Sequence, residues 1–143
     1  GDEAGGYARL ERLFSGWSIE RYARENVRVA ADTPLWELTE GKEKEITCRA
    51  IGEAAALGDE VALGIVDEIA RYVGLAIANG ITLMHPEVFV LGGGVSLMGD
   101  VLLEPIRRVV DELAYEAYGG GTPVVGAELG ENVVVVGGLL LAG

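Results

Sequence analysis

The chain has 143 residues and a formal net charge of −12, from 23 acidic and 11 basic side chains. Half of the residues are apolar, which is enough for a substantial core in one compact domain and argues against intrinsic disorder. The acidic excess opposes the phosphate neutralisation on which nucleic-acid binding depends, and it disfavours an anionic membrane surface for the same reason. We therefore expect neither nucleic acid nor membrane as a partner of this chain.

Cysteine content and terminal composition indicate the cellular compartment. Cys48 is the single cysteine, so an internal disulfide is impossible, which fits a reducing cytoplasm. We expect Cys48 to be a small apolar residue on a helix. No basic segment followed by an apolar one opens the sequence, and the apolar stretch 61–84 carries charges such as Asp67 and Arg71. The sequence predicts a cytoplasmic protein without a signal peptide or membrane span, and its opening in mid-pattern suggests a fragment.

The first half of the chain reads as helical. Residues 32–45 form the most polar stretch and are expected to be a surface connection, followed by an Ala-rich helix over 46–57. Asp59 is a candidate N-cap for a long helix that ends before Pro86. Its buried face is predicted from apolar residues four apart, widened by Tyr72, Ala76 and Leu83: Val61, Ile65, Ile69, Val73, Ile77 and Ile81.

The second half alternates strand and helix. The run "EVFVLG" predicts a short strand covered on both faces, and residues 101–118 predict a helix with Pro105 near its first turn. After three glycines, "TPVVGAEL" predicts another strand, so the order indicates an α/β layer. The closing "ENVVVVGGLLLAG" is ambiguous, although its β-branched residues favour a strand.

Between the first strand and the next helix lies a glycine-rich turn. Gly92, Gly93 and Gly94 have no Cβ, and the hydroxyl of Ser96 follows closely. Bare backbone of this kind can donate N–H groups to phosphate, but the spacing matches neither the dinucleotide nor the P-loop pattern. On the residues alone, a tight structural turn and a nucleotide site both remain open.

The other candidate residues are expected to have structural roles. His85 is the only histidine and lies where a helix meets a strand, so a capping or packing role is expected rather than metal ligation. A Ser-His or Cys-His catalytic pair cannot be assigned from one histidine. Trp17 and Trp36 are expected to be packing anchors.

The ordered series of motifs resembles the ROK family of sugar kinases and sugar-responsive repressors. The segment "AALGDEVALGIVDEIARYVGLAIANGITLMHPEVFVLGGGVS" carries it, together with the "LLEPIRRVV" that follows. "LERLFSGWSIERYAR" is similar to the family's L-E-x-x-x-S-G-x-x-I segment, and "LGENVVVVGGLLLAG" resembles its closing helix. The resemblance spans nearly all of this chain but only about the C-terminal half of a family member.

The resemblance implies a fold and a set of binding residues. Residues 1–143 would form the C-terminal lobe of a two-lobe sugar kinase, an α/β lobe of the actin-like ATPase (ribonuclease H-like) fold with a sheet flanked by helices. Its glycine turn, comprising Gly92, Gly93, Gly94, Val95 and Ser96, would face the adenosine and α-phosphate of ATP. Glu11 would accept hydrogen bonds from sugar hydroxyls, which suits a carboxylate. The closing residues would be a helix.

One segment departs from the family pattern. Aligned on Glu11, the zinc motif C-x-C-G-x-x-G-C-x-E meets Asp2, Ala4 and Arg9 at its cysteine positions and Ala8 at its second glycine. These side chains cannot replace three thiolates in a tetrahedral zinc site. We therefore predict no structural zinc.

The activity implied by the resemblance is ATP-dependent phosphorylation of a hexose, as in a glucokinase. The family's phosphate loop, catalytic aspartate and E-x-x-G-H sugar segment precede the point where this chain begins, so the catalytic residue is unknown and Mg²⁺ would be bound mainly through the missing N-terminal lobe. The isolated chain is expected to be inactive, and a homo-oligomer is expected. Two alternatives are the sugar-sensing domain of a ROK-type repressor and an independent acidic α/β interaction module.

Overall fold

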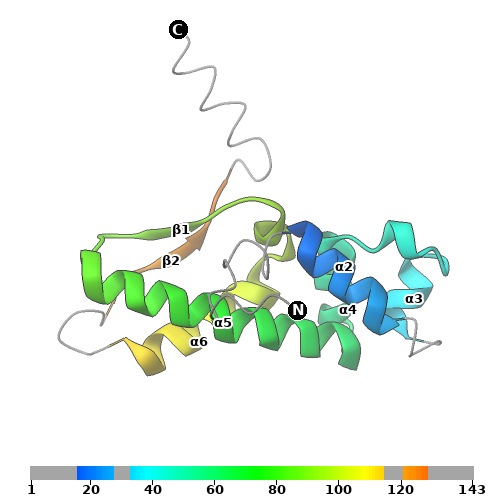
Figure 1. The fold of residues 1–143 in the computed structure, drawn as a ribbon, viewed down its shortest axis with the longest axis horizontal. Coiled ribbons are helices and arrows are strands. Elements are labelled where there is room, and N and C mark those ends of the chain that lie inside the picture. The colour runs from blue at the N-terminus through cyan, green and yellow to red at the C-terminus, as the bar shows by residue number, and fades with distance from the viewer. Residues whose placement is uncertain (1–15, 28–32, 115–120, 129–143) are drawn as a thin grey trace, which may run out of the picture.

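The structure is a computed structural model that describes residues 16–27, 33–114 and 121–128, without the side chains of residues 17, 26 and 27. Figure 1 shows one group of helices over one half of α5 and two strands over its other half. In chain order the elements are α2 (Gly16–Val27), α3 (Pro34–Leu38), the 3-10 helix η1 (Glu43–Glu45), α4 (Cys48–Ala56), α5 (Glu60–Met84), β1 (Phe89–Leu91), the 3-10 helix η2 (Gly94–Met98), α6 (Asp100–Leu113) and β2 (Val124–Gly126).

The long helix α5 begins and ends as predicted. Asp59 caps its N-terminus, because Oδ1 accepts a hydrogen bond from the Ala62 N–H at 2.9 Å. Pro86 disfavours helical geometry at the residue before it, and His85 occupies the C-cap in the left-handed region at φ 48°. The stripe from Ile65 to Ile81 is buried. α5 therefore forms the central support of the described chain.

Two residues expected to widen the buried face of α5 are exposed instead. Tyr72 is 37% exposed and Leu83 is 81% exposed. The apolar residues spaced four apart already face α4 and α6, whereas Tyr72 and Leu83 lie about 100° or more around the helix from the centre of that face. Within the described residues, the C-terminal half of α5 is therefore covered on one face only.

The polar stretch 32–45 is not merely a surface connection, contrary to the prediction. It contains α3 and η1, and Leu35 of α3 is fully buried. Thr33 caps α3 by accepting from the Trp36 N–H at 3.3 Å, and Pro34 occupies the first helical position. A threonine cap followed by proline is a helix-start signal, which the polar composition of this stretch obscured.

α4 lies against both α2 and α5. It begins at Cys48, whose side chain is buried as predicted, after the N-cap Thr47. Glu20 of α2 ties the two helices together, because its Oε1 accepts from the Cys48 N–H at 3.2 Å. Trp36 packs against the core, as expected, whereas the side chain of Trp17 lies outside the described part.

The unit β1–α6–β2 confirms the predicted α/β layer. The strands are parallel, with Phe89 paired with Val124 and Leu91 with Gly126. α6 ends at Leu113, not at residue 118, because Ala114 is extended. Pro105 lies inside α6 rather than in its first turn, since the helix begins at Asp100. The helix continues past Pro105, although proline has no backbone N–H to donate.

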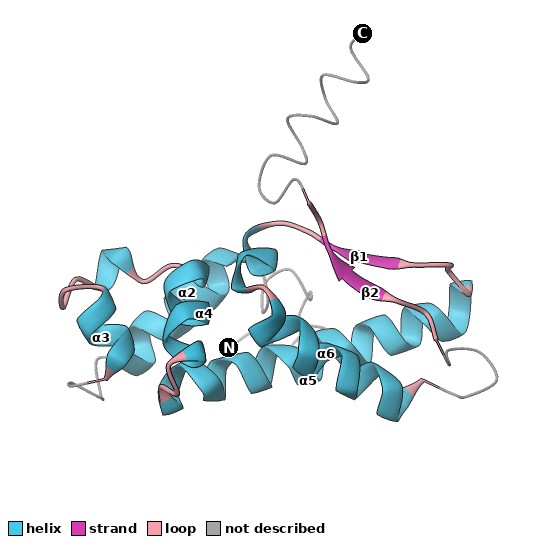
Figure 2. Cartoon of the chain, turned by 180° about the vertical axis from the view of Figure 1, so that it is seen from behind, coloured by secondary structure: helices cyan, strands magenta, loops and turns pink. Residues whose placement is uncertain are grey.

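The small sheet is covered on one face only within the described residues. Figure 2 shows α5 and α6 on the same side of β1 and β2. Phe89 and Leu91 pack against the core on that side, whereas Val88 is 46% and Val90 55% exposed. The expectation of cover on both faces is therefore wrong for this part of the chain. The closing segment 131–143, predicted as strand or helix, lies outside the described residues.

Among the described residues, the helices are too short or too polar to cross a membrane.

Candidate functional site

The carboxyl ends of β1 and β2 lie together at one edge of the sheet. The Ala127 N–H donates to the Leu91 carbonyl at 2.8 Å. A Cβ built on Gly92 would lie 3.6 Å from the Cβ of Ala127, so the residues that follow the two strands are neighbours. In open α/β sheets, ligands bind outside this edge.

The glycine turn starts at this edge and is open to one side. Gly93 has a φ of 82°, in the region that favours glycine, and a Cβ there would meet nothing within 4 Å. Gly92 is exposed. The Ser96 N–H and its Oγ both donate to the Gly93 carbonyl, at 3.0 and 2.7 Å. Ser96 therefore closes the turn, and a ligand can approach the main chain at Gly93.

The rear of the turn rests in the core. Val95 is 8% and Met98 4% exposed, and η2 lies against α4. A Cβ on Gly52 of α4 would lie only 3.0 Å from the Met98 Cα. The turn is thus held by packing from behind while its front is free.

Arg107 connects α6 to β2 away from the turn. Its Nε donates to the Val124 carbonyl at 2.9 Å, and its Nη1 lies 2.7 Å from Glu104 Oε1 and 3.8 Å from Asp100 Oδ1. The guanidinium is therefore committed to the amino end of β2. We assign it no role at the glycine turn.

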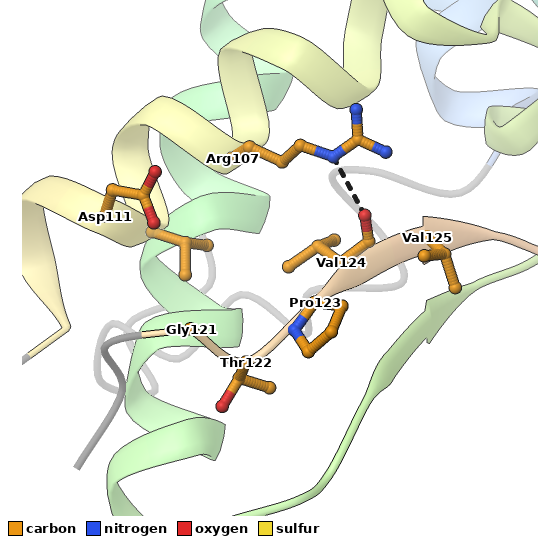
Figure 3. A pocket seen from close by; sticks show the side chains of 8 residues that line it. Arg107, Asp111, Gly121, Thr122, Pro123, Val124 and Val125 are labelled. Atoms are coloured by element: carbon orange, nitrogen blue, oxygen red, sulfur yellow. Dashed lines mark hydrogen bonds between the residues drawn. The ribbon is translucent and has the colours of Figure 1, made fainter.

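A cavity of about 320 Å³ lies between α6 and the amino end of β2, lined among others by Arg107, Asp111 and Thr122. Figure 3 shows these side chains with the hydrogen bond from Arg107 to Val124. The parallel register places this cavity at the end of the sheet opposite Gly92. It is not part of the glycine-turn site.

Several predicted site residues lie outside the described part of the chain. These are Glu11, the predicted sugar contact, and the positions Asp2, Ala4, Ala8 and Arg9 at which zinc was predicted to be lost. The first described element, α2, begins at Gly16, five residues beyond Glu11. The structure therefore brings Gly92, Gly93, Gly94, Val95 and Ser96 together and leaves the prediction for Glu11 untested. His85 occupies a helix cap, as expected.

A magnesium ion needs several oxygen ligands in octahedral geometry. Within the described residues, no group of three or more His, Cys, Asp or Glu side chains is placed to hold a metal ion. We assign no Mg²⁺ ligand to this part of the chain.

The sequence interpretation missed two residues of the site. Ala127 faces Gly92 because the strands are parallel, and Gly52 touches η2 because α4 packs there. The first could have been found by aligning the residues that follow the two predicted strands. The second depends on a contact between residues 46 positions apart in the sequence and has no local signal.

Known proteins provide the decisive comparison. A model of the ROK family matches residues 5–143. This chain belongs to the ROK family. Its β1–α6–β2 layer and its structural neighbours give it the actin-like ATPase fold of ROK sugar kinases, as the sequence predicted.

The relatives include both branches of the ROK family. The glucokinase of Halalkalibacterium halodurans is 38% identical over 90% of this chain and 39% of its own length. The xylose repressor of Caldicellulosiruptor bescii is 29% identical over 65% of this chain and 23% of its own. The chain thus spans about two fifths of the glucokinases that it matches.

Two solved structures resemble this ROK chain closely. A ROK family glucokinase from Streptomyces griseus, in complex with glucose and AMPPNP, is 32% identical with a TM-score of 0.81, over 96% of this chain and 45% of its own. A ROK family transcriptional regulator is 27% identical with a TM-score of 0.70, over 87% of this chain and 30% of its own.

Proposed function

We propose that the complete protein carrying these residues transfers the γ-phosphoryl group of ATP to a hexose hydroxyl, as a glucokinase does. The observation that carries this proposal is Gly93, at φ 82° beside open space and at the carboxyl edge of a parallel sheet. The similarity to glucokinases, one of them in complex with glucose and AMPPNP, supports the same activity.

In this proposal the chain supplies the adenosine side of the cleft. Gly92–Ser96 places bare backbone against the adenosine and α-phosphate, where main-chain N–H groups can donate to phosphate oxygens. Ser96 keeps this backbone in position through its two hydrogen bonds to the Gly93 carbonyl. Glu11 would accept hydrogen bonds from sugar hydroxyls, which become stronger when the acceptor is charged.

The remaining functions belong to sequence outside these residues. The general base that accepts the hydroxyl proton and the main Mg²⁺ ligands would come from an N-terminal lobe. Mg²⁺ would offset the charge of the phosphates, and closure of the two lobes would exclude water. We expect the protein to be cytoplasmic and to form homo-oligomers. A lobe separated from its partner would also expose an apolar face, which favours association.

A kinetic comparison of two glycine variants of the complete protein tests the proposal. Gly93→Ala and Gly58→Ala introduce the same methyl group at nearly the same positive φ, 82° and 88°, and both positions have open space. Gly93→Ala should raise the KM for ATP about tenfold or more, because misplacement of a binding group by a fraction of an ångström is costly. Gly58→Ala, in the loop after α4, should leave KM unchanged.

The assay measures ADP release from ATP, first with glucose as the substrate and then with other hexoses. Absence of hexose-dependent ADP release from the wild-type protein would refute the kinase proposal. Equal KM values for ATP in the two variants would remove the glycine turn from the nucleotide site.

A sugar-sensing repressor is the second candidate, supported by the likeness to the ROK family transcriptional regulator. Its DNA-reading helices would lie outside these residues, since the charge of −12 disfavours DNA binding here. A repressor would bind a sugar in the absence of ATP, retain specific DNA binding in the complete protein and release no ADP. Family membership makes an unrelated interaction module the least supported interpretation.

A further inference from the structure

The contact between Gly52 of α4 and Met98 of η2 is unusually close. A Cβ on Gly52 would lie 3.0 Å from the Met98 Cα and 3.3 Å from its Cβ and carbonyl oxygen. None of these atoms is the free end of a flexible side chain, so an added methyl group would have to move the main chain. Glycine inside a helix is less favourable than alanine by about 1 kcal/mol, so this close approach is a physical reason for its presence.

A shift at Met98 would be transmitted to the glycine turn. η2 contains only five residues, and the turn is closed by successive hydrogen bonds: Ser96 N–H to the Gly93 carbonyl at 3.0 Å, and Gly99 N–H to the Ser96 carbonyl at 3.2 Å. Met98 is 4% exposed and so has little room to yield within the core. Displacement of Met98 therefore moves Gly93 as part of one short, bonded segment.

α4 is also tied to α2. Glu20 of α2 accepts from the Cys48 N–H at the start of α4, and Arg24 donates to the Ile46 carbonyl at 3.0 Å just before it. α2 begins five residues beyond Glu11, the expected sugar contact. α4 thus contacts both η2, which carries part of the glycine turn, and α2, the helix that follows Glu11 in the sequence.

We propose that Gly52 is a positioning residue that fixes the location of Gly93 and thereby sets the affinity for ATP. This inference rests on the proposed kinase function. Gly52 itself touches no substrate, and it acts through Met98 and the hydrogen bonds of the turn. The opposing interpretation is that Gly52 only permits α4 and η2 to pack and that the turn adapts to any change.

The test is Gly52→Ala in the complete protein, with two glycine controls. Gly64→Ala adds a methyl group to α5 where nothing lies within 4 Å. Gly74→Ala places its Cβ 2.6 Å from Val109 Cγ1, ten residues along α6 from Gly99, which corresponds to about 15 Å of helix. It disturbs packing without acting on the turn.

Two readouts separate positioning from stability. Calorimetry with a non-hydrolysable ATP analogue should show a Kd about three- to tenfold higher for Gly52→Ala, with the KM for hexose unchanged. Amide hydrogen exchange should become faster in residues 93–99 and remain unchanged in the C-terminal half of α5. Gly64→Ala and Gly74→Ala should both leave the Kd for the analogue as in the wild type.

An unchanged Kd together with unchanged exchange in residues 93–99 would overturn the inference, as would an equal loss of affinity in Gly74→Ala. If Gly52→Ala does not fold, Met98→Ala keeps the atoms that Gly52 faces but removes the buried side chain that anchors η2 in the core. It should give the same two changes, and their absence would overturn the inference too. If the wild-type protein binds no nucleotide, the kinase proposal fails by itself. Exchange in residues 93–99 then decides whether Gly52 positions the turn.

Discussion

Asp59 joins two helices from a buried position, and its replacement provides a quantitative test of the fold. The residue is 2% exposed. Its Oδ1 accepts from the Ala62 N–H of α5 at 2.9 Å, and its Oδ2 accepts from the Leu35 N–H of α3 at 2.7 Å. Asp59→Ala removes both acceptors at once.

The expected loss can be divided between the two bonds. Loss of an N-cap costs about 1 kcal/mol, and a buried N–H left without an acceptor costs about 1–3 kcal/mol. Leu35 is fully buried, so water does not easily replace the carboxylate. We expect Asp59→Ala to lower the free energy of unfolding by about 2–4 kcal/mol.

Two further variants separate the contributions. Asp59→Ser keeps a cap oxygen for Ala62 but cannot also reach Leu35, so it should lose only the second part, about 1–3 kcal/mol. Thr47→Ala removes the exposed cap of α4, whose Oγ1 accepts from the Ala50 N–H at 3.2 Å, and should cost about 0.5–1 kcal/mol.

The assay is denaturant unfolding of the complete protein, with hydrogen exchange to locate the change. Asp59→Ala should accelerate exchange at the Leu35 amide more than Thr47→Ala does. If Asp59→Ala costs no more than Thr47→Ala, the two-acceptor account of this residue is wrong.

Two other predictions follow from named contacts, and a third follows from the proposed location of the general base. Arg24→Met removes hydrogen bonds to the Glu43 and Ile46 carbonyls and the ion pair with Glu20, and should cost about 1–3 kcal/mol in denaturant unfolding. Gly74→Ala should cost about 1–3 kcal/mol because of Val109, and Val109→Ala in the same chain should recover part of that loss, measured as a double-mutant cycle. The isolated 143-residue chain should release no ADP with ATP and glucose, whereas measurable turnover by it would contradict the expectation that the general base lies elsewhere.

The elements that could be predicted from sequence have local causes. α5 follows from apolar residues at intervals of four, a capping aspartate and a terminating proline, all of which act within a few residues. β1, α6 and β2 follow from changes of hydrophobic period at glycines, and the glycine turn was located because three glycines interrupt an apolar run. The proposal of a nucleotide as the ligand of this turn required the resemblance to ROK proteins.

The features that could not be predicted depend on distant partners. α3 was not predicted because polar residues outnumber apolar ones in the stretch 32–45 that contains it. The aspartate that accepts from the Leu35 N–H lies 24 residues away. The exposure of Leu83 is likewise set by what packs against α5. Gly52 appears in sequence as an unfavourable residue within an alanine-rich helix, and only its contact with Met98 explains it.

The exposed apolar residues in and next to β1 indicate how this face of the sheet is packed in the complete protein. Side chains alternate along a strand, so Phe89 and Leu91 face α5 and α6 while Val88 and Val90 face away. A buried valine contributes about 1.5–3 kcal/mol relative to an exposed one, and a two-stranded sheet is marginal by itself. Val90, at 55% exposed, leaves much of that contribution unrealised within the described residues. We therefore expect this face to be covered in the complete protein, and a separated chain to self-associate through it.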